Sequence, residues 1–570
     1  MSAFYDIWIG GNAPSYKRGS NNDWHHISGN TWLSLPGNSD FITEVENEKH
    51  KLVLIGQLYE KIDKPELLNR CVNFIHNPDN KYNDPAGHYI IFVTAITSGD
   101  VYVFTNRMGS YHAYWSKDKI ISTNYLALAK AKTNKKLNWE GITGFMAMGY
   151  FPNDTTYLQG INIFEPACYY HFDSDLNLLE KKRWWQWDYQ PTEKPAESSI
   201  NELKGILHSS LTIATDNKRT VIPVSGGLDS RLLAGELTSR GGWHYKSLQA
   251  LCYGYTADSP EIQIGRQIAK ARNLPIHSYQ LPDYLFEQLD EIAEAVELFQ
   301  YVDGTRQASA TDWLKHNADV VVGGHWGDVW MDSMNIEEKA DLVPAFQKKI
   351  IKKGSQWLLD NICQQHVKDS SAYLNDYFQS FVSQYSHIDS ADFLMKIYKT
   401  DQWSFRWTAA SLRMYQAAVM PVLPFYDKRI VDLFCTIPGD LAKNRELQIA
   451  YLKQHHEDLA RITWQEYDAD LYNYKYFNNR NVAYRAVKKI QRTITKTKPV
   501  QRNWEVFYLN PNGKINLEQR LLGNKLLSEL VPGYKIKELL DDLHNRPIAA
   551  NGYAVSMLLT FAVFLDKVFK

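Results

Sequence analysis

The sequence predicts two parts of different fold class, an α+β sandwich followed by an α/β domain whose last portion is helical. Residues 1 to about 190 alternate short β-like runs with turn residues, which fits stacked antiparallel sheets. From residue 200 onward, strands and helices alternate as in a doubly wound parallel sheet. From about residue 340 the pattern is helical. We therefore expect one domain over residues 1–190 and a second over residues 200–570.

The composition is typical of a globular protein and excludes several functional classes. The 570 residues carry 63 basic and 64 acidic side chains, a net charge of -1, so no positive field is available for a nucleic-acid partner. No stretch approaches the roughly 18 apolar residues of a membrane span, and the first ten residues do not resemble a leader peptide. We expect a cytoplasmic protein without a membrane partner. No two cysteines form a C-x-x-C pair, which argues against a disulfide framework or a thiolate zinc site. The cysteines are Cys71, Cys168, Cys252, Cys363 and Cys435.

The N-terminal part contains five β-like runs and two helical patterns. The runs cover residues 4–9, 51–55, 88–95, 101–105 and 168–172, and the helical patterns cover residues 65–77 and 138–148. A linker is expected near residues 186–199, where two prolines interrupt any pattern. A helix over residues 200–214 then leads into the second domain.

A glycine pair lies between a predicted strand and a predicted helix in residues 221–237. Gly226 and Gly227 let the backbone turn sharply and approach a ligand, and the first turn of the helix offers unpaired N–H groups to an anion. Ser225 and Ser230 add hydroxyl donors at the two ends of the loop. Asp229 would repel a phosphate unless a cation such as Mg2+ binds carboxylate and phosphate oxygens together. The loop therefore predicts a phosphate cradle, with a chance Gly-Gly turn as the alternative.

The loop lacks the lysine of a Walker A motif. Residues 225–230 read S-G-G-L-D-S and resemble the S-G-G-x-D-S loop of the PP-loop ATP pyrophosphatases, which have an adenine nucleotide alpha hydrolase-like fold. The resemblance implies that the loop grips the β,γ-pyrophosphate of ATP and releases it when a substrate is adenylated.

Three further strands are expected at residues 247–253, 275–281 and 319–322, with a helix from Ser259 to Arg272 between the first two. Ligands of such sheets sit at the carboxyl ends of the strands. Cys252, Tyr253 and Gly254 are therefore candidates to line the adenine pocket. For Cys252 the alternative is a small buried hydrophobe.

The strand at residues 319–322 runs into G-G-H-W-G-D, residues 323–328. This run resembles the S-G-E-G-S-D-E segment of the asparagine synthetases, with Gly324, Gly327 and Asp328 in register. The resemblance implies that Asp328 is the second Mg2+ carboxylate and faces Asp229 across the nucleotide. It also implies that Gly323 and Gly324 approach the nucleotide closely.

His325 stands where these synthetases have a glutamate placed to assist the incoming nitrogen; β-lactam synthetases use a tyrosine, and lasso-peptide cyclases have a similar G-H-x-G-D run. A neutral imidazole can accept a proton from an amine that attacks an acyl-adenylate. A structural turn residue is the alternative. Arg306 resembles an arginine that lies near the nucleotide phosphates, and a surface ion pair is its alternative.

Residues 83–89 and 105–115 resemble the glutaminase domain of the class B asparagine synthetases, an Ntn-hydrolase-like sandwich. In the active family a cysteine follows the initiator methionine, and its thiol attacks the glutamine amide. Here that position is Ser2, and the first cysteine is Cys71. We expect a glutaminase-defective domain that is retained as a scaffold.

Residues 420–429 resemble a proline-containing element of the same family, after which the family places a lysine that stabilises charge on the adenylate and pyrophosphate. Lys443 and Arg445 are both candidates for that role. The aromatic, Asn-rich residues 467–481 diverge from true asparagine synthetases, and such a loop either shapes a substrate site or is an ordinary surface loop. An amphipathic helix is expected over residues 553–570.

Together these resemblances imply an ATP- and Mg2+-dependent ligase that adenylates a carboxylate, releases pyrophosphate and AMP, and transfers the acyl group to an amine. The expected substrates are small-molecule or peptide carboxylates and amines. A precursor peptide, a partner enzyme and a second copy of the chain are possible partners. The alternatives are a lasso-peptide-type macrolactam cyclase and a nucleotide-binding scaffold without turnover.

Overall fold

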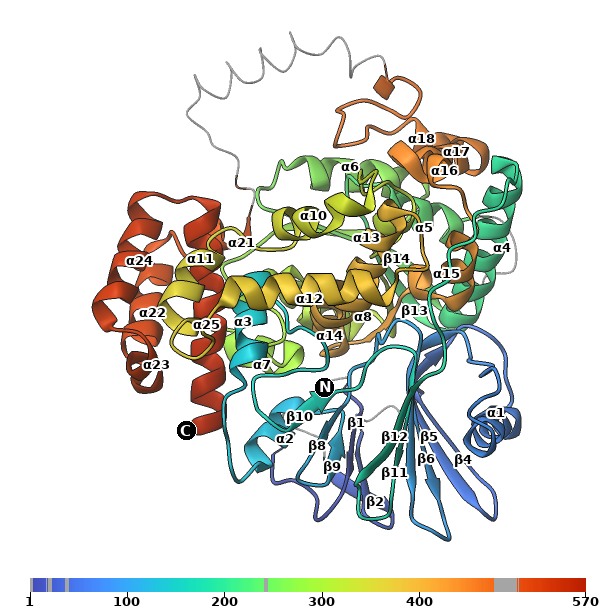
Figure 1. Ribbon diagram of the computed structural model, residues 1–570. Coiled ribbons are helices and arrows are strands. Elements are labelled where there is room, and N and C mark those ends of the chain that lie inside the picture. The colour runs from blue at the N-terminus through green and yellow to red at the C-terminus, as the bar shows by residue number, and fades with distance from the viewer. Residues whose placement is uncertain are drawn as a thin grey trace.

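The computed structural model describes residues 4–16, 18, 23–35, 40–239, 244–475, 500 and 502–570. Figure 1 shows an N-terminal β-sandwich below a second, larger part in which helices surround a parallel sheet. The architecture is a mixed α/β fold in which the two parts share one continuous hydrophobic core.

Two six-stranded antiparallel sheets form the sandwich, in the orders β10-β8-β9-β1-β3-β2 and β12-β11-β7-β6-β5-β4. Residues of β5 alternate between two cores, as strand geometry requires. Val53 and Ile55 face the other sheet, whereas Leu52 and Leu54 face helix α1 (Lys64–His76). The strands are β1 Asp6–Ile9, β2 Trp24–Ser28, β3 Thr31–Ser34, β4 Ile42–Glu46, β5 His50–Leu58, β6 Gly87–Ala95, β7 Val101–Thr105, β8 Tyr114–Ser116, β9 Ile120–Ser122, β10 Ile161–Ile163, β11 Cys168–Phe172 and β12 Leu178–Arg183.

The five predicted β-like runs fall on β1, β5, β6, β7 and β11, and the two helical patterns fall on α1 and α3 (Trp139–Met148). The other sandwich strands were not predicted. Three of them have only three residues, and each of the other four mixes apolar with polar or charged residues without a continuous apolar run. Helix α2 (Tyr125–Ala131) begins at Asn124, whose side chain accepts a hydrogen bond from the Ala127 N–H.

The predicted doubly wound parallel sheet is present as five strands in the order β15-β14-β13-β16-β17, with every neighbouring pair parallel. The chain leaves β13 toward β14 on one side and returns to β16 on the other, so the strand order reverses between β13 and β16. Ligands of such sheets bind at this switch point, at the carboxyl ends of the strands. The strands are β13 Arg219–Pro223, β14 Ser247–Gly254, β15 Ile276–Gln280, β16 Val320–Val322 and β17 Met420–Val422.

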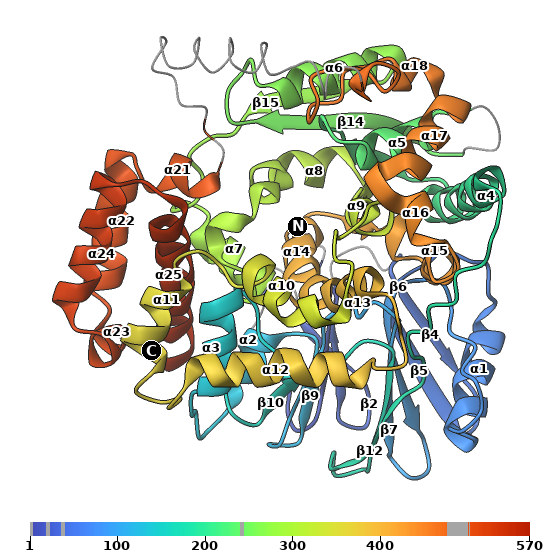
Figure 2. The same cartoon turned by 45° about the horizontal axis from the view of Figure 1, so that its top comes forward.

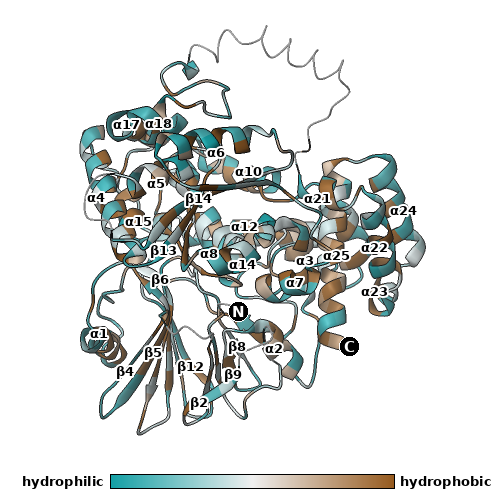
Figure 3. Ribbon diagram, turned by 180° about the vertical axis from the view of Figure 1, so that it is seen from behind, coloured by the Kyte–Doolittle hydropathy of each residue, from teal (hydrophilic) through white to brown (hydrophobic). Residues whose placement is uncertain are grey.

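Helices cover both faces of this sheet. Figure 3 shows β13 and β14 as apolar strands among helices with hydrophilic outer faces, and Figure 2 shows α17 and α18 beside α5 and α6. The helices around the sheet are α4 Ala196–Thr215, α5 Asp229–Leu237, α6 Pro260–Ala271, α7 Leu289–Val296, α8 Thr311–Asn317, α9 Gly327–Trp330, α14 Ala409–Gln416, α15 Lys428–Phe434, α16 Gly439–Ala442, α17 Glu446–His455 and α18 Glu457–Ala460.

The remaining helices form the C-terminal and connecting layers. They include a ten-residue π-helix, η5 (Lys399–Thr408), which continues α13. The others are α10 Leu342–Lys349, α11 Ser355–Leu358, α12 Ser370–Gln384, α13 Ala391–Tyr398, α21 Asn503–Phe507, α22 Pro511–Leu522, α23 Lys525–Leu530, α24 Gly533–Asn545 and α25 Ala549–Phe569.

Helix α25 corrects two expectations. It is buried around most of its circumference, because α2, α3, α22 and α24 all contact it, so it is a core helix and not an amphipathic one. Among the described residues, α25 is also a helix that is long enough and apolar enough to cross a membrane, although no such stretch was expected. In its most apolar window, 78% is buried inside the protein.

Buried charges join the sandwich to the second part. Glu297, fully buried, accepts hydrogen bonds from the Tyr114 hydroxyl and the Tyr125 N–H at 2.7 Å each and pairs with Arg18 and Arg413. Arg107 bonds both carboxylate oxygens of Asp84 at 3.0 Å. The guanidinium of Arg107 also pairs with Asp432 of helix α15.

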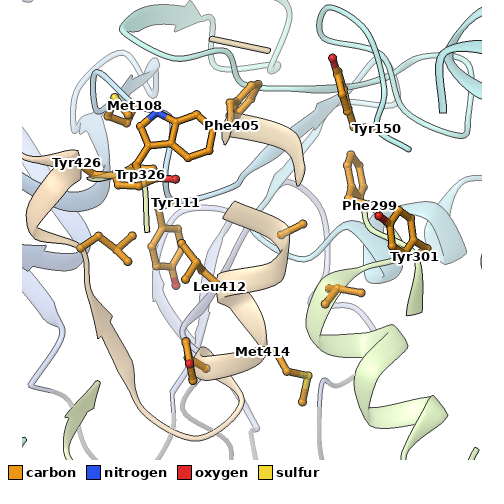
Figure 4. Packing of buried hydrophobic residues seen from close by; sticks show 14 of the residues in the cluster. Met108, Tyr111, Tyr150, Phe299, Tyr301, Trp326, Phe405, Leu412, Met414 and Tyr426 are labelled. Carbon is orange, nitrogen blue, oxygen red and sulfur yellow. The ribbon is translucent and has the colours of Figure 1, made fainter. Parts of the chain in front are cut away.

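Apolar contacts run across the same boundary. Met108 of the sandwich lies with Trp326, which follows β16, and Phe405 of η5 in one buried cluster (Figure 4). A Cβ atom on Gly109 would lie 2.7 Å from the Phe405 ring. The interface is therefore packed as tightly as a domain core.

Candidate active site

The predicted phosphate loop lies between the end of β13 and the start of α5. Its two serines close it: the Ser225 N–H donates to Ser230 Oγ at 3.2 Å, and the Gly227 N–H donates to Ser225 Oγ at 3.3 Å. Helix α5 begins at Asp229 without a side-chain cap, so its first N–H groups remain available to an anion. Pro223 is the last residue of β13, where the missing N–H costs no interior ladder bond.

The loop after β16, residues 323–328, approaches the phosphate loop closely. A Cβ atom on Gly324 would lie 3.0 Å from the Ser230 nitrogen, and one on Gly327 would lie 2.8 Å from Asp229 Cγ. A side chain at either position would press on the residues at the start of α5. Trp326 turns the loop with a φ of 81° and donates its indole N–H to Thr400 Oγ1 of η5 at 3.1 Å.

This close approach brings the two predicted carboxylates together. The Asp328 N–H donates to Asp229 Oδ2 at 3.1 Å, and Gln448 Nε2 donates to Asp229 Oδ1 at 2.7 Å. Burial, followed by the neighbouring Asp328 carboxylate, raises the pKa of Asp229 to about 7. Asp328 itself is exposed. Two carboxylates from adjacent strand ends therefore share one small region.

Arg445, rather than Lys443, reaches this pair. Its Nη1 atom lies 3.5 Å from Asp229 Oδ1, and its Nε atom lies 3.5 Å from Asp332 Oδ2. Asn444 and Arg445 both have left-handed backbone torsions, with φ of 57° and 58°, which turn the chain before α17. Lys443 instead lines a separate cavity of about 490 Å³ together with Ser333, Asp392 and other residues.

His325 lies within electrostatic range of Asp328 and Arg306. Burial lowers the pKa of His325 to about 4; Asp328 acts to raise it and Arg306 acts to lower it. Its Nδ1 atom is buried and has no hydrogen-bond partner among the described residues. The ring is therefore neutral at pH 7.

The end of β14 contributes one aromatic wall. Arg306 is exposed and places its guanidinium 6.0 Å from the Tyr253 ring centroid and 5.8 Å from that of Tyr255. It forms cation–π contacts with both rings, and no ion pair of Arg306 occurs among the described residues. A Cβ atom on Gly254 would lie 2.9 Å from Ser259 Cβ, so Gly254 permits the turn into α6.

Cys252 does not join this wall. Its thiol donates to the Glu261 carbonyl at 3.2 Å, and a Cβ atom on Gly265 of α6 would lie 2.6 Å from Cys252 Sγ. Successive residues of a strand point to opposite faces of the sheet, so Cys252 and Tyr253 lie on opposite faces of β14. Cys252 is buried under α6.

Several residues near the site were not predicted. Gln465 packs on the phosphate loop, because a Cβ atom on Gly226 would lie 2.5 Å from Gln465 Cβ, and Gln465 Nε2 donates to Glu261 Oε1 at 2.7 Å. Fully buried Arg231 holds the preceding segment by donating to the carbonyls of Ile462 and Thr463 at 2.7 Å each. No sequence motif marks Gln465 as a site residue. Arg231 directly follows the phosphate-loop motif in the sequence, but its contacts with residues 462 and 463 could not be predicted from that position.

Two predicted features fall partly or wholly outside the described residues. Position 2, on which the glutaminase expectation depends, is one of them. Of the aromatic residues 467–481, only 467–475 are described. There Tyr467 and Tyr474 pack on Trp464, with ring centroids 4.5 and 5.6 Å away.

No group of three or more histidine, cysteine or acidic side chains suited to a metal occurs among the residues the structure describes. Mg2+ differs from zinc in needing only one or two protein carboxylates, since water and phosphate oxygens complete its shell. Asp229 and Asp328 fit that requirement. In this structure the Asp229 carboxylate is contacted by Arg445 and Gln448.

A scan against protein-family models finds no match. A search of curated proteins also finds none. Among solved structures, a U34-tRNA thiolase from Methanococcus maripaludis aligns at 14% identity with a TM-score of 0.21, covering 53% of this chain and 82% of that chain. NMN synthetase from Francisella tularensis aligns at 13% identity with a TM-score of 0.20, covering 37% of this chain and 95% of that chain. Scores this low carry no conclusion about the activity of this chain.

Proposed function

We propose that this chain is an ATP-dependent ligase of the PP-loop, asparagine synthetase-like kind, which adenylates a carboxylate and transfers the acyl group to an amine. The observation that carries the proposal is the meeting of Asp229 and Asp328 at the switch point of the parallel sheet. Burial and the neighbouring Asp328 carboxylate raise the pKa of Asp229, and a raised pKa of this origin in a strand-end site is typical of functional groups.

The phosphate loop supports ATP as the substrate. The hydroxyls of Ser225 and Ser230, 3.2 Å apart, and the uncapped N–H groups at the start of α5 lie together at the carboxyl end of β13. Arg445 adds a positive charge beside Asp229. These donors match an anion with several oxygens, such as a di- or triphosphate.

Asp229 and Asp328 would hold Mg2+ together with the phosphate oxygens. When bound, the ion supplies positive charge that offsets the charge on the departing pyrophosphate. The chain's own residues would orient the nucleotide: the serine hydroxyls and α5 amides bind its phosphates, and Arg445 faces the same charge from the turn before α17.

The proposed chemistry has two steps. An oxygen of the substrate carboxylate bonds to the α-phosphorus of ATP, and the bond to the bridging oxygen breaks as pyrophosphate leaves with the electron pair. The amine nitrogen then bonds to the acyl carbon, AMP leaves, and the amine loses a proton. A general base works best when its pKa is near the working pH. With a pKa of about 4, His325 is a weak base and is better suited to accept a hydrogen bond from the amine.

The test is acid-dependent exchange of labelled pyrophosphate into ATP over a panel of acids and peptides. We expect exchange with the correct acid, AMP as the nucleotide product, and a loss of at least a hundredfold in Asp229→Ala and in Asp328→Ala. Asp376→Ala, which alters an exposed aspartate on α12, is the matched control and stays at the wild-type rate. Formation of ADP in place of AMP would refute the proposed chemistry.

The same assay separates the modes of amide formation. If the acid and the amine belong to one molecule, the product is the substrate less one water and no added amine is required, as in a macrolactam cyclase. We propose that the sandwich is a scaffold without glutaminase activity, so glutamine does not replace the amine. Release of ammonia from glutamine would contradict this assignment.

A further inference from the structure

A cluster of two lysines and two tryptophans lies next to the proposed ATP site, and none of the chemistry above uses it. Lys399, Trp403 and Trp407 belong to the π-helix η5, and Lys352 follows α10. We call these four residues the Lys–Trp cluster. π-helical segments are rare and occur most often at functional sites.

Both ammonium groups face the same indole ring. Lys352 Nζ lies 5.0 Å from the Trp403 ring centroid and 5.7 Å from that of Trp407, and Lys399 Nζ lies 5.2 Å from the Trp403 centroid. The rings of Trp403 and Trp407 meet edge to face at 5.8 Å. Each lysine is half-buried, so two like charges sit together in a partly dry region.

The cluster makes no direct ion pair. Within the described ranges, neither Lys352 nor Lys399 contacts a carboxylate at ion-pair distance, and Asp328 and Asp332 act on Lys399 only from farther away. Burial and the second lysine lower the pKa of Lys352 to about 8, so it stays mostly charged at pH 7. The Trp403 Nε1 atom is buried and finds no hydrogen-bond acceptor among the same residues. The cluster thus combines two ammonium groups around one indole ring with an indole N–H that has no acceptor among the described residues.

The cluster is adjacent to the reacting groups. Thr400, next to Lys399, accepts the indole hydrogen bond of Trp326 in the loop that carries Asp328. Burial lowers the pKa of Lys399, while Asp328 and Asp332 act to raise it, so these carboxylates lie within electrostatic range of its ammonium group. A molecule that reacts beside Asp328 can therefore extend to the cluster.

We propose that the Lys–Trp cluster is an anion-binding site that holds a second anionic group, a carboxylate or a phosphate, on the acid that this chain adenylates. Unpaired buried charges are costly to the fold and are retained where a ligand supplies the opposite charge. That the bound anion belongs to the adenylated acid rests on the proposed function, but the anion binding itself can be measured without turnover.

The first experiment measures protection of single lysines. The full chain is treated briefly with acetic anhydride, and acetylation of each lysine is read by peptide mass spectrometry, with glutarate, phosphoglycolate or butyrate present. We expect glutarate or phosphoglycolate to slow acetylation of Lys352 and Lys399 at least threefold. Butyrate, which carries one charge, leaves both unchanged, and exposed Lys353 is the internal control. Whichever dianion protects identifies the group as carboxylate or phosphate. If neither dianion protects, the proposal is wrong.

The second experiment uses Lys352→Met and Lys399→Met, with Lys353→Met as the matched control. Removing one of two unpaired like charges should raise the melting temperature by about 1–3 °C while abolishing dianion protection of the remaining lysine. A lysine with a merely structural role would lower the melting temperature, and that result would overturn the proposal. Protection that persists in a chain without acid-dependent pyrophosphate exchange would support the anion site and refute the ligase.

Discussion

The comparison of Arg445→Ala with Lys443→Ala tests which basic residue stabilises the negative charge of the ATP phosphates during adenylation. Arg445 Nη1 lies 3.5 Å from Asp229 Oδ1. Two unit charges at such a distance interact by about 5 kcal/mol at an effective dielectric constant of about 20, and a phosphate oxygen bound beside Asp229 would interact with the guanidinium with a similar energy. Because the Arg445 side chain is 17% exposed, solvent screens part of this energy. We expect the variant to lose about 2–3 kcal/mol of transition-state stabilisation.

That loss corresponds to a roughly 30- to 150-fold lower rate of pyrophosphate exchange. Lys443→Ala should stay within about threefold of wild type, because Lys443 contacts no predicted phosphate-binding residue in the described structure. Arg445→Lys should recover part of the rate, since it keeps the charge but not the planar fork. A larger effect at Lys443 than at Arg445 would refute this reasoning.

Three further predictions test the loops and the buried groups. Gly324→Ala should weaken ATP binding and, in a thermal melting assay, destabilise the protein by about 1–3 kcal/mol, because the new Cβ atom would press on the phosphate loop. The control, Gly205→Ala, lies in open space on α4 and should be neutral or stabilising in the same assay. Burial raises the pKa of Asp303 to about 6, so its contribution to stability is present at low pH and is lost as the pH rises through about 6. Asp303→Asn should therefore raise the melting temperature at pH 7.5 and flatten its pH dependence between pH 4 and 6, and an unchanged pH profile would contradict the assignment. Cys252→Ala should leave the KM for ATP within about twofold, since the thiol faces α6; a tenfold change would return Cys252 to the nucleotide site.

Local pattern was sufficient for much of the fold. Strands β6 and β14 contain apolar runs at residues 89–93 and 250–253, so the burial of their central residues is visible in the sequence. The three-residue strands β8, β9 and β10 form only because their neighbours in the first sheet supply hydrogen-bond partners. Helix α25 was expected to be amphipathic because its neighbours could not be known from the sequence.

The candidate site divides in the same way. The sequence alone determined which loops follow β13 and β16 and that Asp229 and Asp328 lie in them, because turn glycines and strand ends are local features. Only the tertiary structure decided that the two loops touch, that Arg445 reaches Asp229 while Lys443 does not, and that the Lys–Trp cluster lies beside them. Contacts between residues far apart in the chain depend on how strands order themselves in a sheet and on single backbone torsions, such as the left-handed turn at Asn444, which no local pattern encodes.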